Sequence, residues 1–185
     1  MSKRVQKLII LLFFASLVLT ACSKELTDVL NLNEQVEING SNIDEVITEA
    51  LDIKRSAFLP GDFFCSTYHV LQRDEDATGA TLYLLVTHGW YSRIAAYVEQ
   101  VSGCGIVCGV LRVTRESDLY AIEKYSEYEI KQLLDSSEEV FPASVIDEVL
   151  ANEDDYYVML KEAMKKKVIE HFGYEHDLHP ALFQR

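Results

Sequence analysis

The apolar periodicity of this chain changes twice, and this change limits the fold more than any single motif. From residue 42 to 54 apolar side chains such as Ile43 and Val46 recur at helical spacing. Between residues 63 and 128 the period becomes two, and β-branched and aromatic residues accumulate, as they do in strands. The helical period returns after Glu129. The order helix, strands, helices predicts an α+β domain.

The central segment predicts four strands, at residues 63–73, 80–91, 106–115 and 119–128, arranged as an antiparallel meander. Both faces of the second strand are apolar, which is typical of a central strand. We expect a four-stranded antiparallel sheet with an N-terminal helix and C-terminal helices packed on one face.

The C-terminal part predicts three helical pieces. They lie near residues 130–134, at 143–150 behind Pro142, and from Asp154 or Asp155 to Gly173. The last piece has one apolar stripe, made of Tyr157, Leu160, Met164, Val168 and Phe172.

The first residues have the features of an export signal. Three basic residues precede an apolar run at residues 8–19, which has the length of a signal-peptide core rather than of a membrane span. Leu19-Thr20-Ala21-Cys22 then resembles the bacterial lipobox. This predicts that residues 1–21 are a lipoprotein signal peptide and that Cys22 is the lipidation site and the first mature residue.

The leader determines the expected domains and location. Residues 22–40 are polar without a sustained period and predict a tether, and residues 41–185 predict a single α+β domain. We expect the chain on the extracytoplasmic face of the cell membrane, held by its lipid. Ser23 is compatible with sorting to the outer membrane in a host that has one.

The charge excludes one class of partner. Loss of the leader removes three of the 17 basic residues and none of the 30 acidic ones, so the formal charge moves from −13 to −16. Such a surface repels phosphate, and we expect no nucleic-acid partner. Contact with the membrane is expected through the N-terminal lipid anchor.

Three cysteines remain after Cys22, namely Cys65, Cys104 and Cys108, so one disulfide would leave a thiol over. Residues four apart on a strand are about 13 Å apart, so a Cys104–Cys108 disulfide would need a bend at residues 103–105. A bridge from Cys65 to either partner, and buried reduced thiols, are the other interpretations.

The histidines give weak metal signals. A zinc site of Cys65, His69 and His88 can be drawn, but no ligand pair adjacent in the sequence supports it, and a histidine hydrogen-bonded within the sheet is the alternative. His171, His176 and His179 near the C-terminus are typical of a solvated tail. We expect no cofactor and no resident metal.

The usual catalytic motifs are missing from the sequence. It has no His-Glu-x-x-His zinc motif, no Gly-x-Ser-x-Gly elbow and no phosphate-binding or dinucleotide-binding glycine loop. We therefore expect a non-enzymatic domain that binds a protein, peptide or envelope component through its sheet or through residues 103–109. The alternatives are a thiol-dependent enzyme or redox protein using Cys65, Cys104 or Cys108, and a metal-binding lipoprotein.

Roughly residues 63–142 carry a resemblance to a known kind of domain. The residues that carry it are Thr67-Tyr68-His69-Val70, Leu82-Tyr83-Leu84-Leu85-Val86, Val101-Ser102-Gly103, Val110-Leu111-Arg112-Val113, Tyr120-Ala121-Ile122-Glu123-Lys124-Tyr125 and Phe141-Pro142. In their order and spacing they resemble an uncharacterised small exported domain of Firmicute lipoproteins, also found at the extracytoplasmic end of BlaR-like membrane metallopeptidase sensors. After Tyr125 the chain departs from that pattern, with Ser126-Glu127-Tyr128 where a Trp and a Pro-Asp-Gly-like segment are usual. The peptidase motif of those sensors is absent, so the resemblance implies the fold and no catalytic role.

Overall fold

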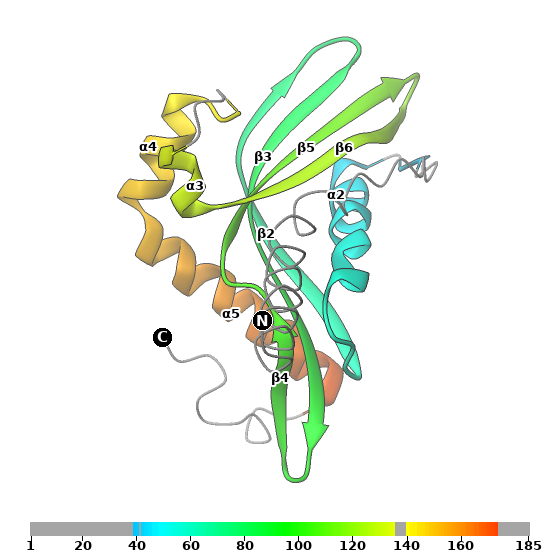
Figure 1. The fold of residues 1–185 in the computed structure, drawn as a ribbon. Coiled ribbons are helices and arrows are strands. Elements are labelled where there is room, and N and C mark those ends of the chain that lie inside the picture. The colour runs from blue at the N-terminus through cyan, green and yellow to red at the C-terminus, as the bar shows by residue number, and fades with distance from the viewer. Residues whose placement is uncertain (1–38, 41, 136–139, 174–185) are drawn as a thin grey trace, which may run out of the picture. The chain divides into compact units, whose positions relative to one another are not determined.

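The computed structural model describes residues 39–40, 42–135 and 140–173, which form a domain of one β-sheet and several helices (Figure 1). The leader, Cys22 and most of the expected tether lie outside this part of the chain. The elements in order are β1 (Asn39–Gly40), α2 (Ile43–Asp52), the 3-10 helix η1 (Ile53–Ala57), β2 (Phe63–Glu75), β3 (Gly79–Ile94), β4 (Tyr97–Gly103), β5 (Val107–Glu116), β6 (Leu119–Glu129), α3 (Ile130–Asp135), α4 (Ala143–Ala151) and α5 (Glu153–Phe172).

The strands form one antiparallel sheet in the order β1-β6-β5-β3-β2. β3 pairs with β2 along one edge from Phe63↔Tyr91 to Glu75↔Ala80. Its other edge pairs first with β5 and then, from Gly89 onward, with β4. β3 is therefore the central strand of the sheet and changes partner halfway along its length.

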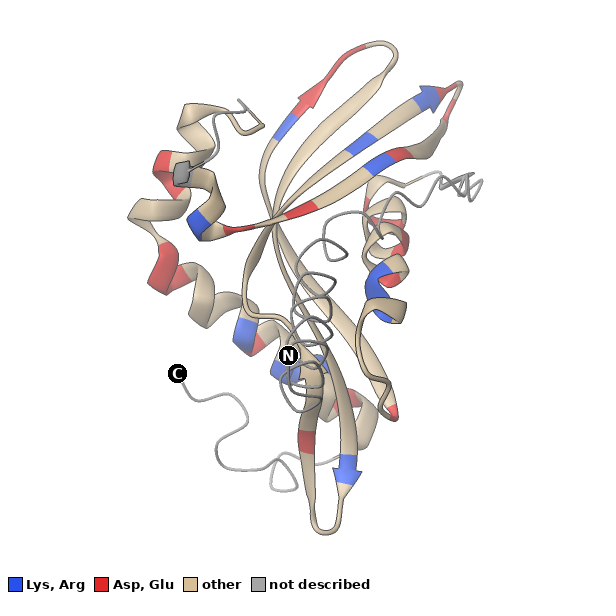
Figure 2. Ribbon diagram, viewed as in Figure 1, with Lys and Arg blue, Asp and Glu red and all other residues tan. Residues whose placement is uncertain are grey.

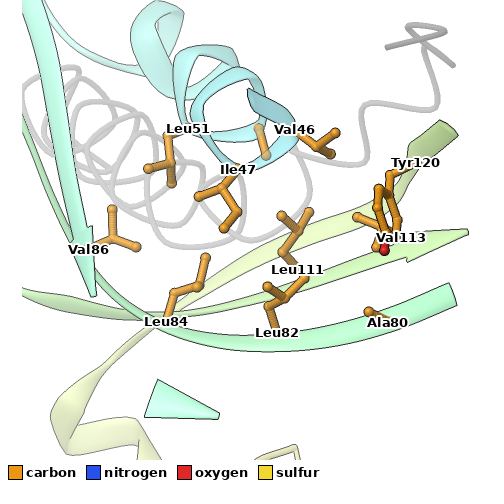
Figure 3. Close-up of a cluster of buried hydrophobic side chains, with 11 residues drawn as sticks. Val46, Ile47, Leu51, Ala80, Leu82, Leu84, Val86, Leu111, Val113 and Tyr120 are labelled. Carbon is orange, nitrogen blue, oxygen red and sulfur yellow. The ribbon is translucent and has the colours of Figure 1, made fainter. Parts of the chain in front are cut away.

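α2 covers one face of the sheet. Its first turn is capped by the Asn42 side chain, which accepts a hydrogen bond from the Asp44 N–H at 3.0 Å. Figure 3 shows the helix directing its apolar stripe onto alternate residues of the central strands. This cluster contains Val46, Ile47, Ala50 and Leu51 of α2 with Ala80, Leu82, Leu84, Val86, Leu111, Val113 and Tyr120 of the sheet.

α4 and α5 cover the opposite face, where the intervening residues of the same strands point. Leu85 and Cys108 contribute to a cluster with Val145, Val149 and Leu160. Further along, Met164 and Val168 of α5 pack on the same face in a cluster with Cys65, Tyr91 and Val98. The central strands are therefore buried on both sides.

The α+β class is confirmed, with an antiparallel sheet contacted by an N-terminal helix and C-terminal helices. Two details differ from expectation. The helices are divided between both faces, because the two apolar faces of β3 each need a cover. The sheet also contains β1 and β4 beyond the expected meander of β2, β3, β5 and β6. β4 was missed because its turn at Ala95, with φ 55°, lacks the usual Gly or Asn.

Candidate functional site

The three cysteines are all free thiols. Cys65 lies on the α5 side, and its thiol donates a hydrogen bond to the Met164 sulfur at 3.0 Å. Cys108 is fully buried in the cluster under α4. Cys104 is half-buried just after β4, and its backbone N–H donates to the His88 carbonyl at 3.2 Å. In the structure these three cysteines are therefore reduced thiols, and no disulfide joins any two of them.

Burial makes these thiols poor nucleophiles. It raises the pKa of Cys65 and of Cys108 to about 12 each, and the pKa of Cys104 to about 11. Lys167 acts in the opposite direction on the pKa of Cys65 but is outweighed by burial. Because the thiolate is the reactive form, a thiol-dependent mechanism gains no support from this arrangement.

The residues of the drawn zinc site are not brought together. Ser66 pairs with His88 and faces α2, whereas Cys65 is one residue away on β2 and faces α5. His69 packs its ring on Tyr156 of α5, at 5.1 Å between centroids. In the described part of the chain no three His, Cys, Asp or Glu side chains are grouped closely enough to hold a metal ion.

The C-terminal histidines have separate outcomes. His171 stacks on Phe63 with ring centroids 3.9 Å apart, so it is part of the packing between α5 and β2. His176 and His179 lie outside the described residues.

His88 is instead the centre of a buried polar network on the α2 side. Its side chain has no exposed surface. Nδ1 lies 2.7 Å from the Ser66 hydroxyl, and Nε2 lies 2.7 Å from Glu127 Oε1. One tautomer satisfies both contacts, with Nε2–H donating to Glu127 and Nδ1 accepting the Ser66 proton. Phe58 and Phe64 pack their rings within 6.0 Å of the imidazole.

Glu127 joins this network to two other elements. Tyr125 donates its hydroxyl hydrogen to Glu127 Oε1 at 2.7 Å, and Lys54 of η1 lies 3.4 Å from Oε2. Burial by itself would raise the pKa of Glu127, but the hydrogen bonds from His88 and Tyr125, together with the nearby Lys54 ammonium, hold that pKa below its ordinary value.

The connectivity Ser66–His88–Glu127 resembles a serine, histidine and acid relay. A relay must reach a substrate, however, and His88 is sealed beneath Phe58 and Phe64. The network satisfies buried polar groups and ties η1 to β2, β3 and β6. We interpret it as a structural element of the α2 side.

An open pocket lies on the other face of the sheet, where β3 meets the three C-terminal helices. Its volume is about 200 Å³. Its walls are mostly aliphatic and aromatic, and one carboxylate belongs to the lining. The residues are Leu85 of β3, Ile106 before β5, Ile130 of α3, Val149 of α4, and Glu153, Tyr156 and Tyr157 of α5.

The size of the pocket limits what it can hold. Apolar cavities of roughly 150 Å³ take up a benzene molecule, whereas drug-sized ligands need about 300–1,000 Å³. A pocket of 200 Å³ therefore fits one aromatic or aliphatic side chain. Ile106 lies in the segment 103–109, which the sequence singled out for binding. The other walls come from separate elements and leave no local sequence signal.

Among the residues that the structure covers, no helix is long and apolar enough to cross a membrane. No protein-family model matches this chain. No curated protein matches it, and no solved structure does.

Proposed function

We propose that this chain is a lipid-anchored extracytoplasmic lipoprotein whose domain binds a protein, peptide or envelope component without catalysis. The pocket beside Ile106 supports this proposal, because it is open, mainly apolar and sized for one side chain. The resemblance of residues 63–142 to exported lipoprotein domains agrees with it. The anchor would be the lipid on Cys22, on the outer face of the cell membrane or on an outer membrane where the host has one.

The thiol and metal alternatives have less support. The cysteine thiols are buried with raised pKa values, and the described part of the chain groups no metal-ligand set. No observation favours either alternative over the binding domain.

Binding through the pocket is tested by filling it. Ile106→Trp places a bulky ring in the pocket wall, and Leu119→Trp is the matched control because Leu119 is 43% exposed on the far end of β6. A photo-crosslinking residue at Tyr157 would be irradiated in intact cells. We expect one reproducible crosslinked product with the unmodified pocket and with Leu119→Trp, and none with Ile106→Trp. Equal crosslinking in all three would contradict the proposal.

The anchor is tested separately. Cells grown with radiolabelled palmitate should label the wild-type chain and leave Cys22→Ser unlabelled and released from the membrane fraction. A wild-type chain that stays unlabelled would remove the proposed location and leave the pocket test unaffected.

A further inference from the structure

We propose that the pocket binds a cationic peptide segment, with one apolar side chain inside and Lys or Arg residues over the rim. This inference rests on the proposed function and adds the chemistry of the partner. It starts from the one carboxylate that lines an otherwise apolar pocket, Glu153.

Glu153 is exposed at the start of α5. In the described part of the chain it makes neither a hydrogen bond nor an ion pair, whereas the neighbouring Glu148 accepts the Tyr156 hydroxyl hydrogen at 2.6 Å. A carboxylate beside an apolar pocket, without a partner of its own, is placed to meet a positive group on whatever enters.

The surroundings of the pocket have the same sign. Among the residues from 129 to 157 whose side chains the structure describes, one is basic, Lys131, and six are acidic, namely Glu129, Asp147, Glu148, Glu153, Asp154 and Asp155. Figure 2 shows acidic positions at both ends of the α4–α5 connection. Charge of one sign around a small apolar cavity attracts ligands of the opposite sign and repels anionic ones.

The aromatic walls also accept cations. Lys161, one helical turn beyond Tyr157, places its ammonium 5.5 Å from the centre of that ring. Burial lowers the pKa of Lys161, and it lies eight residues beyond Glu153, about 12 Å along the helix. In the described part of the chain, Lys161 and Glu153 form no ion pair with each other. A Lys or Arg beside the inserted side chain would find the carboxylate on one side and tyrosine rings on the other.

The test uses three labelled synthetic peptides and the full-length chain in non-ionic detergent. Each peptide has a central Phe, flanked on both sides by Lys, by Ser or by Glu. Fluorescence anisotropy gives the dissociation constants at low salt and at about 1 M salt, where charges are screened within about 3 Å. We expect the Lys peptide to bind about tenfold more tightly than the Ser peptide at low salt and to lose that advantage at high salt. The Glu peptide should bind most weakly.

Two variants assign the effect to the pocket. Glu153→Gln should weaken binding of the Lys peptide about two- to fivefold and leave the Ser peptide unchanged. Glu162→Gln is the matched control, since Glu162 is exposed on the same helix but absent from the pocket lining, and should bind like the wild type. Ile106→Trp should abolish binding of all peptides, with Ile130→Trp as a second filling variant if the first fails to fold.

The outcomes separate the two proposals. If the Lys and Ser peptides bind equally and both are lost on filling the pocket, the proposed function stands and the cationic partner is rejected. If the Lys peptide binds but ignores the filled pocket, its binding is general attraction to an acidic chain and the inference is rejected. If none of the peptides binds and crosslinking is unchanged by Ile106→Trp, both proposals are rejected.

Discussion

At the scale of single residues, Glu127 connects more elements of the α2 side than any other charged group described above. Its carboxylate contacts His88 of β3, Tyr125 of β6 and Lys54 of η1. Among the described residues no buried side-chain nitrogen or oxygen is left without a partner. If one member of this network is removed, the remaining buried polar groups lose a hydrogen-bond partner that water cannot easily replace, and this destabilises the fold.

Glu127→Gln should lower the free energy of unfolding by about 1–3 kcal/mol, because Lys54 and the His88 N–H lose a charged acceptor. Glu123→Gln is the control, since Glu123 lies on the same strand but is exposed, and should change stability by less than about 0.5 kcal/mol. Urea unfolding at pH 7 measures both. Equal stability of the two variants would show that the network contributes nothing.

The pH dependence follows from the lowered pKa of Glu127. A carboxyl whose pKa is lower in the folded state stabilises the fold above its unfolded pKa, and this contribution disappears as the pH falls through the folded pKa. The stability gap between wild type and Glu127→Gln should therefore be full above about pH 5 and shrink below the ordinary value of 4.5. Urea unfolding of both proteins from neutral to acidic pH checks this, and a gap that widens on acidification would contradict it.

The three thiols should react slowly in the folded chain. With pKa values of about 11 or above, only a small fraction is thiolate at neutral pH. Cys104 is half-buried and should be alkylated first, followed by Cys65 and Cys108, and all three should react quickly in denaturant. Mass spectrometry over an iodoacetamide time course gives the order. Fast labelling of Cys65 or Cys108 in the native state would revive the thiol alternative.

Residue-level reasoning from the sequence recovered part of the site. It selected Cys65, Cys104 and Cys108 and left their state open, and it gave a histidine hydrogen-bonded within the sheet as the alternative to a zinc site at His88. It could not find Glu127 as the partner of His88, because 39 residues separate them and only the pairing of β5 with β3 and β6 brings them together. The pocket could not be predicted either, because its lining residues come from elements far apart in the sequence.

At the scale of elements, the join between β4 and β5 depends on glycine. Gly103 has φ 153°, and it pairs with Gly89 of β3. A β-carbon at residue 103 would collide with the His88 carbonyl oxygen and the Gln100 side chain. The sequence associated residues 103–105 with a bend, and the structure has one between β4 and β5.

Gly103→Ala should therefore destabilise the fold by about 1–3 kcal/mol. Gly105→Ala offers a matched control two residues away, because a β-carbon there meets nothing within 4 Å, and it should stay within about 0.5 kcal/mol of the wild type. Thermal and urea unfolding of the two variants measure the difference. Equal effects would mean that the loop relaxes around either side chain.

At the scale of the whole molecule, the class of fold was predictable and the distribution of its layers was not. Periodicity identified the helices and the four long strands, because the side chains that face the core recur every 3.6 residues in a helix and every two residues in a strand. It could not divide the helices between the faces, since both faces of β3 are apolar and the buried residues of α2 or α5 could pack on either one. The two-residue β1 is too short to show an alternation, and β4 follows a turn at Ala95 that lacks the usual Gly or Asn.

The overall charge should make stability depend on salt. A chain with a formal charge of −13 experiences mutual repulsion among its carboxylates in the folded state, and added salt screens it. We expect the melting temperature at pH 7 to rise by a few degrees between low salt and about 0.3 M sodium chloride, measured by differential scanning calorimetry. A fall over this range would show that attractive ion pairs, such as Arg73–Glu75, dominate.

β3 contributes side chains to the clusters on both faces of the sheet. Its even-numbered residues from Leu82 to His88 serve the α2 side, and Leu85 forms part of the pocket wall. Deleting a single residue in the middle of β3 would turn each later side chain to the opposite face of the sheet, so that residues packed against α2 would meet α4 and α5 and the reverse. Single-residue deletions should therefore be least tolerated between Leu85 and His88. A scan of such deletions along β3 should give its lowest yield of folded protein there.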